Sequence, residues 1–451
     1  MDIYNGIRRH SGMEKVSFHM PGHKAGRAFV GTPFENDLFR LDTTELPGTD
    51  CLMAPEGIIK KSQEHAAALY GAKQAFYLVN GSTCGILAMF YACFREGDVV
   101  LADRNCHRSV LNAMILAGVR PIWLAPDWDA ALCAAGKVPC SLVEEQFRQN
   151  RNIKGIFLTS PNYYGICSDV AETARIAHQN GAVLLVDEAH GAHFPFSSRF
   201  PANAMAQGAD ICVTSLHKTL PAPNQTALLL VGERLQNKAE IADAVCMFQT
   251  TSPSYLLMSY MDAALDYAER YGGQRTEELL PDIEKIPHLP TDDPLKSIVS
   301  FSQKGYSGYE AELLLRERFG IFAELCDAQN VLFMVSWGNT KEDFMLLEKA
   351  LRFIKELPDK SRIPIPIPPV FAAHSHLSPK EVSRLAREEA CAENAAGRVC
   401  AAAVTAFPPC IPILLPGEII TEAHISYIRE LRRNQLVVTG MNRDCFFVVP
   451  E

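Results

Sequence analysis

Short, nearly continuous apolar runs recur along the chain from residue 75 and alternate with longer stretches of helical periodicity. A strand covered by helices on both faces is apolar on both, so these runs predict the strands of a buried, mostly parallel sheet. The stretch 168–181 predicts a connecting helix that begins with Ser168 as N-cap and closes on Gly181, and 84–97 predicts another. The alternation is typical of a doubly wound α/β fold with helices on both faces of the sheet. Seven strands are predicted, at residues 75–79, 99–102, 121–124, 155–158, 182–186, 211–214 and 227–231.

A polar, proline-dotted stretch at residues 271–295 changes this pattern and predicts a domain boundary. Beyond it, strands are predicted at 298–301 and 331–335, and helices at 309–319 and 341–355. We therefore expect a large domain over residues 1–270 and a smaller C-terminal α+β domain over 271–451. The proline-rich segment 361–370 is predicted to be a linker.

Composition and charge narrow the class of protein. The chain has 451 residues, 48% of them hydrophobic and 21% charged, which is typical of a soluble globular protein. Its net charge of −9 argues against nucleic acid or an anionic membrane as the main partner, because both attract basic surfaces. No apolar run approaches the roughly 20 residues that span a bilayer, and the N-terminus lacks the apolar segment of a signal peptide. The 14 cysteines are scattered without a C-x-x-C pair, so we expect free, mostly buried thiols in a cytoplasmic protein.

Polar residues capable of chemistry follow four of the predicted strands. The segment "VNGSTCG" (79–85) offers backbone N–H groups and the hydroxyls of Ser82 and Thr83 at a helix N-terminus, a natural phosphate site. Asp187 ends the strand before "EAHGAH", His107 lies in "RNCHRSV", and Lys218 closes "TSLHK". Singly these have ordinary interpretations, since Asn-Gly-Ser is a common turn and most strand-end lysines are surface groups. Together they are the set that pyridoxal 5'-phosphate (PLP) requires.

With these motifs the chain resembles a known family, the Orn/Lys/Arg decarboxylases. These are PLP enzymes of the aspartate-aminotransferase fold, fold type I. The resemblance runs almost end to end. It is carried, in order, by "FHMPGHKAG" (18–26), "TTELPGTDCLMAPEGII" (43–59), "LVNGSTCGILAM" (78–89), "RNCHRSV" (104–110), "TSPNYYGICSD" (159–169), "VDEAHGAHF" (186–194), "TSLHKTLPAPNQTA" (214–227), "TSPSYLLM" (251–258) and "PPCIPILLPGE" (408–418).

The resemblance implies a role for each candidate site residue. Lys218 carries PLP in a Schiff base, and Asp187 pairs with the protonated ring nitrogen. His107 stacks over the ring and Ala189 packs beneath it, while Glu418 faces the distal cationic group of the substrate. The residues placed around the phosphate or its approach are Ser82, Thr83, Ser215 and His217.

The chain also departs from the family pattern. Cys84 and Cys410 stand where the family has glycine, so two turns are expected to differ without the loss of a catalytic group. Long family members begin with an additional wing domain, whereas the motifs begin here by residue 18. We therefore expect the short form without the wing, and the effector control associated with the wing is not implied.

The implied activity is decarboxylation of a basic L-amino acid to the corresponding amine and CO2, as in polyamine biosynthesis. Arginine, lysine and ornithine stay open as substrates, in that order with little separation, and Lys218 or His217 is the expected proton donor at Cα. The alternatives are an aminotransferase or aldolase on the same fold, and a non-catalytic protein that retains the fold. The intact pair of Asp187 and Lys218 argues against the last of these.

Further expectations concern partners and other polar residues. A homodimer or higher homo-oligomer is expected, with Thr251 or Ser252 lent to the cofactor site of the partner chain. The pair His190 and His193 could bind a metal, but zinc usually takes three or four ligands, so no metal is expected. Tyr163 and Tyr164 are expected to pack rather than react, and His19 and His23 to fix the glycine-containing N-terminal motif.

Overall fold

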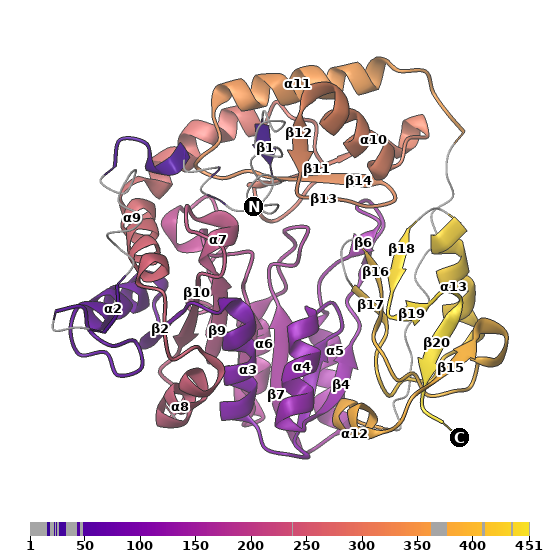
Figure 1. Ribbon diagram of the computed structural model, residues 1–451, viewed down its shortest axis with the longest axis horizontal. Coiled ribbons are helices and arrows are strands. Elements are labelled where there is room, and N and C mark those ends of the chain that lie inside the picture. The colour runs from indigo at the N-terminus through magenta and orange to yellow at the C-terminus, as the bar shows by residue number, and fades with distance from the viewer. Residues whose placement is uncertain are drawn as a thin grey trace.

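The computed structural model describes residues 16–18, 22, 24, 27–32, 43–45, 48–236, 238–361, 377–407, 411–433 and 436–450. Within these ranges, a seven-stranded sheet has the order β2-β10-β9-β8-β7-β3-β4 (Figure 1). Its strands pair in parallel except β10, which is antiparallel to both neighbours. The bounds are β2 (Gln74–Leu78), β3 (Val99–Asp103), β4 (Arg120–Leu124), β7 (Ile153–Thr159), β8 (Val183–Asp187), β9 (Ile211–Ser215) and β10 (Ala227–Val231). The seven predicted strands are confirmed, with bounds that differ by at most two residues.

Helices cover both faces of this sheet, which confirms the predicted fold class. Leu185 of β8 packs in one apolar cluster with residues of three helices, whereas its neighbour Leu184 packs in a second cluster on the opposite face. The first cluster draws on α3 (Gly81–Cys93), α4 (Arg108–Ala117) and α8 (Lys238–Phe248), and the second on α2 (Ile58–Tyr70), α5 (Cys140–Gln149), α6 (Val170–Gln179) and α9 (Tyr255–Ile283). The short α7 (Leu216–Thr219) follows β9 directly.

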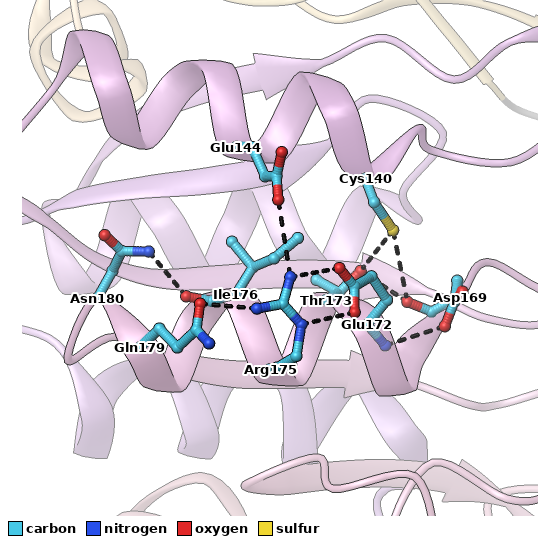
Figure 2. Close-up of polar contacts among 9 residues, drawn as sticks. All are labelled: Cys140, Glu144, Asp169, Glu172, Thr173, Arg175, Ile176, Gln179 and Asn180. Atoms are coloured by element: carbon cyan, nitrogen blue, oxygen red, sulfur yellow. Dashed lines mark hydrogen bonds and ion pairs between the residues drawn. The ribbon is translucent and has the colours of Figure 1, made fainter.

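The N-terminus of α6 differs from the prediction by one residue. Asp169, not Ser168, is the N-cap, and its carboxylate accepts a hydrogen bond from the Glu172 amide at 2.9 Å (Figure 2). Both residue types cap helices well, but the Ser168 hydroxyl accepts a bond from the amide of Val138 instead. Gly181 has a φ of 69°, so the predicted end of the helix at this glycine is confirmed.

Residues 271–283, the first part of the stretch that predicted a domain boundary, are helical. Helix α9 continues through residue 271 to Ile283, with Pro281 inside it. Position 272 of this helix requires glycine, because a Cβ there would lie 2.8 Å from a ring carbon of Trp337. The proposed division at residue 271 thus falls within a helix, and it stays a prediction.

Two smaller groups of elements complete the described chain (Figure 1). The first contains β1 (Val16–Phe18), β11 (Lys296–Ser300), β12 (Ile321–Ala323), β13 (Leu325–Cys326), β14 (Asn330–Met334), α10 (Gly308–Leu314) and α11 (Lys341–Glu356). The second contains α12 (Pro379–Arg384), β15 (Glu388–Cys391), β16 (Val404–Phe407), β17 (Ile411–Leu414), α13 (Glu422–Arg433), β18 (Val437–Thr439), β19 (Met441–Asn442) and β20 (Cys445–Val448). A hairpin of β5 (Trp128–Asp129) and β6 (Ala134–Ala135) lies between β4 and α5 in the chain. The predicted linker at 361–370 lies, after Ser361, outside the described residues.

Two properties of the described chain bear on the expected location. Thirteen cysteines are free thiols, but only four of these are buried, so the expectation of mostly buried thiols is wrong. In the described ranges, no helix is both long and apolar enough to cross a membrane.

Candidate active site

Two neighbouring parallel strands bring Asp187 and the turn that holds Lys218 to the same edge of the large sheet. Asp187 is the last residue of β8, and Lys218 lies in α7, directly after β9. Asp187 is buried, which raises the pKa of its carboxyl group, while Lys218, the Ala189 amide and His107 act in the opposite direction. Its Oδ1 accepts the Ala189 amide at 3.0 Å, and no other described residue donates to the carboxylate. The second oxygen, Oδ2, is therefore available to a buried cation.

Lys218 is half-buried, and its surroundings shift the pKa of its amine. Burial lowers the pKa of Lys218, and the carboxylates of Asp187 and Glu324 oppose this effect. Its Nζ lies 3.0 Å from Nε2 of His190. A lysine whose pKa is lowered by burial supplies more of the neutral, nucleophilic amine near pH 7.

His107 is the N-cap of α4 and is fixed by Ser109. Its Nδ1 accepts from the Ser109 amide at 3.2 Å and lies 2.7 Å from the Ser109 hydroxyl. Desolvation lowers the pKa of His107, while Asp187 opposes this shift. In the neutral ring the proton is therefore on Nε2, and the ring can cover an aromatic ligand without adding a charge.

A candidate phosphate site, called here the phosphate cradle, lies where β2 leads into α3. Gly81 has a φ of 76°, which favours glycine, and the Ser82 and Ser215 hydroxyls are 2.5 Å apart. Thr83 lies exposed in the same first turn. Backbone N–H groups at a helix N-terminus together with two or three hydroxyls suit a bound phosphate.

The imidazole ring of His217 is hydrogen-bonded to the backbone. Its Nδ1–H donates to the carbonyl oxygen of Thr226 at 3.1 Å, and burial lowers the pKa of the ring. The His217 carbonyl oxygen accepts a hydrogen bond from the amide of Gly22, at 2.9 Å. A Cβ at Gly22 would lie 2.4 Å from the Leu220 carbonyl oxygen, so the "FHMPGHKAG" motif needs glycine where it packs on the lysine turn. His19 and His23 of this motif lie outside the described residues.

Glu418 is buried and bound on both carboxylate oxygens. Arg104, which follows β3, contacts both of them, with Nη2 2.8 Å from Oε2, and the Leu415 amide also donates to Oε2 at 2.8 Å. Arg104 Nη2 donates further to the Ile413 carbonyl at 3.0 Å. The pair joins the large sheet domain to the C-terminal group of strands. A substrate cation would have to share Glu418 with Arg104.

We expect Glu418→Gln to lower the free energy of unfolding by about 3 kcal/mol, because it removes the carboxylate that balances the buried charge of the Arg104 guanidinium. Urea unfolding at neutral pH measures this change. The control is Glu233→Gln, which breaks an exposed pair with Lys73 and should cost less than about 1 kcal/mol. Equal, small effects of both substitutions would show that the buried pair does not hold these parts together.

The remaining sequence candidates are used in other contacts. His193 Nε2 bonds to Asp293 at 3.0 Å, His190 bonds to two lysines, and the described residues contain no group of three or more potential metal ligands. The Tyr163 ring packs on His190 with centroids 4.5 Å apart, as expected, and its hydroxyl also donates to Glu324. Cys84 is buried in α3, and Cys410 lies outside the described residues.

Sequence patterns missed two buried charged residues of this region. Arg104 lies in a motif that was selected for His107, and Lys296 is the first residue of β11, which was predicted to begin at residue 298. A charged residue at the edge of a predicted buried strand was the available signal in both cases.

The residues at this sheet edge fit PLP. A buried carboxylate with one oxygen open to a cation, a lysine of lowered pKa, a covering histidine and a helix N-terminus with hydroxyls match its ring nitrogen, aldehyde, ring face and phosphate. The fold and the site define a PLP-dependent enzyme of fold type I.

Comparison with known proteins identifies the family. Residues 2–289 match "Orn/Lys/Arg decarboxylase, major domain" and residues 369–445 match "Orn/Lys/Arg decarboxylase, C-terminal domain". An arginine decarboxylase of Halalkalibacterium halodurans is 32% identical over 98% of this chain and 96% of its own, and one of Bacillus anthracis is 34% identical over 97% and 94%. The fold of lysine decarboxylase A from Pseudomonas aeruginosa is similar, with a TM-score of 0.79 at 20% identity over 99% of this chain and 79% of that one. The chain belongs to the Orn/Lys/Arg decarboxylase family and is a PLP-dependent amino acid decarboxylase.

Proposed function

We propose that this enzyme decarboxylates arginine to the corresponding amine and CO2. The observation that carries the choice among basic amino acids is the similarity, over nearly the whole chain, to proteins named arginine decarboxylase. In sequence, a protein named lysine decarboxylase matches 60% of this chain at 25% identity, and one named biodegradative arginine decarboxylase matches a similar share, 62% at 23%.

The proposed roles follow from the contacts of each residue. PLP, when bound, accepts the electron pair that remains as CO2 leaves. Asp187 would hold the ring nitrogen in its charged form, and the N-terminus of α3 would bind the phosphate with Ser82 and Ser215. His107 covers the ring face and excludes water. Lys218 donates the proton at Cα, a role that it fills better than His217 because Nδ1 of that histidine is bound to a carbonyl.

The choice of arginine is tested by CO2 release with arginine, lysine and ornithine measured in parallel at equal concentrations. We expect the highest kcat/KM for arginine. A higher value for lysine or ornithine would refute the substrate while leaving the decarboxylase class intact. We also propose that Glu418 binds the distal cation of the substrate while it stays paired with Arg104. Among folded molecules, Glu418→Gln should then lose kcat/KM on arginine and keep it on a neutral amino acid.

We propose a cytoplasmic homodimer, acting in polyamine biosynthesis, in which Thr251 and Ser252 reach the site of the partner chain. Both residues are exposed. The loop that carries them lies beside the phosphate cradle, since the Thr250 amide donates to Asn80 at 3.4 Å. The acidic charge balance and the free thiols support the location.

Mixing two inactive variants tests the shared site. A Lys218→Ala chain combined with a Thr251→Ala/Ser252→Ala chain should recover about a quarter of wild-type activity, because half of the dimers are hybrids with one intact site each. Each variant alone serves as the control. No recovery after verified exchange of chains would show that each chain works alone.

A further inference from the structure

Two thiols face each other on neighbouring strands of the C-terminal group. Cys391 is the last residue of β15 and is paired in register with Cys445, the first residue of β20. Their sulfur atoms lie 3.0 Å apart. Cys391 is exposed and Cys445 is half-buried, so reagents in solution can reach them. We call these two residues the dithiol pair.

The position of the dithiol pair in the strand ladder suits a covalent bond. The next pair along, Ala392 and Asp444, is joined by a backbone hydrogen bond of 3.1 Å. Hydrogen-bonded and non-hydrogen-bonded pairs alternate along antiparallel strands, so the dithiol pair is a non-hydrogen-bonded one. The Cα atoms of such a pair are about 4.5 Å apart, within the range of roughly 4.4–6.8 Å that a disulfide spans. A bond of about 2.05 Å needs the sulfurs to approach by only about 1 Å, without movement of the backbone.

The surroundings of the dithiol pair give its two sulfurs different roles. The contact with Cys391 raises the pKa of Cys445 to about 11, and the carboxylates of Glu389 and Asp444 act in the same direction. Cys445 therefore keeps its proton near pH 7 and can donate its S–H to the sulfur of Cys391. Cys391 is also the more exposed of the two, so it is the sulfur that attacks a reagent first. The nearby carboxylates favour an uncharged reagent over an anionic one.

We propose that the dithiol pair is a redox-sensitive modification site, at which a small disulfide from solution converts Cys391 and Cys445 into a cross-strand disulfide. The sulfur of Cys391 attacks one sulfur of the reagent, whose S–S bond breaks and releases a thiolate. Cys445 then loses its proton and attacks the sulfur of Cys391, which releases the other half of the reagent. The protein thiols are oxidised, the reagent is reduced, and the protons of the dithiol pair pass to the released thiolates.

The bond would stabilise the C-terminal group of strands. It closes the segment between residues 391 and 445, which contains β16, β17, α13 and Glu418. A cross-link between residues far apart in sequence reduces the conformational entropy of the unfolded chain, whereas the folded strands already hold these sulfurs together. Glu418 would then stay paired with Arg104 under conditions that unfold the reduced group. Since Lys218 and Asp187 belong to other elements, oxidation leaves turnover unchanged. In a reducing compartment the pair stays as thiols.

The test compares full-length, PLP-loaded protein after incubation with bis(2-hydroxyethyl) disulfide, which is uncharged, and with reduced dithiothreitol. Peptide mass mapping under non-reducing conditions, with free thiols blocked, should show the peptides of Cys391 and Cys445 linked only after the first treatment. The midpoint of thermal unfolding of the C-terminal group should rise by about 5 °C on oxidation and return on reduction. The rate of CO2 release should be the same in both samples.

Cys391→Ser is the variant that decides the cause of the shift. It keeps the strands but cannot form the bond, so its midpoint should be the same after both treatments, and Cys445→Ser replaces it if it does not fold. Cys133→Ser, which removes another half-buried thiol, should behave like the wild type. Two results would overturn the inference. One is a wild-type chain that carries the reagent on Cys391 without a link to Cys445, and the other is a linked chain whose midpoint does not rise.

Discussion

Lys218→Ala is expected to fold normally, to lose the covalent link to PLP, and to decarboxylate at least about 10³-fold more slowly than the wild type. The substitution removes both the attacking amine and the proposed proton donor. Stopped-assay CO2 release and the visible absorbance of the purified protein measure these effects. Lys285→Ala removes an exposed lysine and should change neither. Activity within tenfold of the wild type would exclude Lys218 from the chemistry.

Asp187→Asn is expected to lower kcat by about 10² to 10³-fold with little change in folding, since an amide cannot stabilise the positive charge on the ring nitrogen. Asp103→Asn is the matched control. Asp103 is also a buried carboxylate at the end of a strand, where burial raises its pKa to about 7, and its oxygens accept from the Asn105 and Thr159 amides. We expect it to change stability more than kcat. Equal losses of kcat in both variants would contradict the assigned role of Asp187.

The large sheet was predictable because its strands are buried on both faces and therefore read as uninterrupted apolar runs. Parallel strands place their carboxyl ends at the same edge of the sheet. The location of polar residues at strand ends, such as Asp187 and Ser215, could therefore also be predicted. The continuation of α9 past residue 271 was not predictable in this way, because the reason for Gly272 is the Trp337 ring, more than sixty residues away.

In the candidate site, too, residues in local motifs could be predicted and long-range contacts could not. Residues in contiguous motifs, such as Lys218 and His107, were identified from the sequence. The pairing of Glu418 with Arg104 and the imidazole that contacts both Lys296 and Lys218 join segments that lie far apart in the chain. Only the folded structure shows these contacts, and they decide how the charges of the site are balanced.

The central claim is that Lys218 carries the cofactor. Reduction of the PLP-loaded wild-type protein with borohydride, followed by peptide mass mapping, tests it most directly because it fixes the label where the bond forms. The account predicts the reduced pyridoxyl label on Lys218 alone, and its loss in Lys218→Ala. Label on Lys296, the other buried amine of the site, would contradict the account.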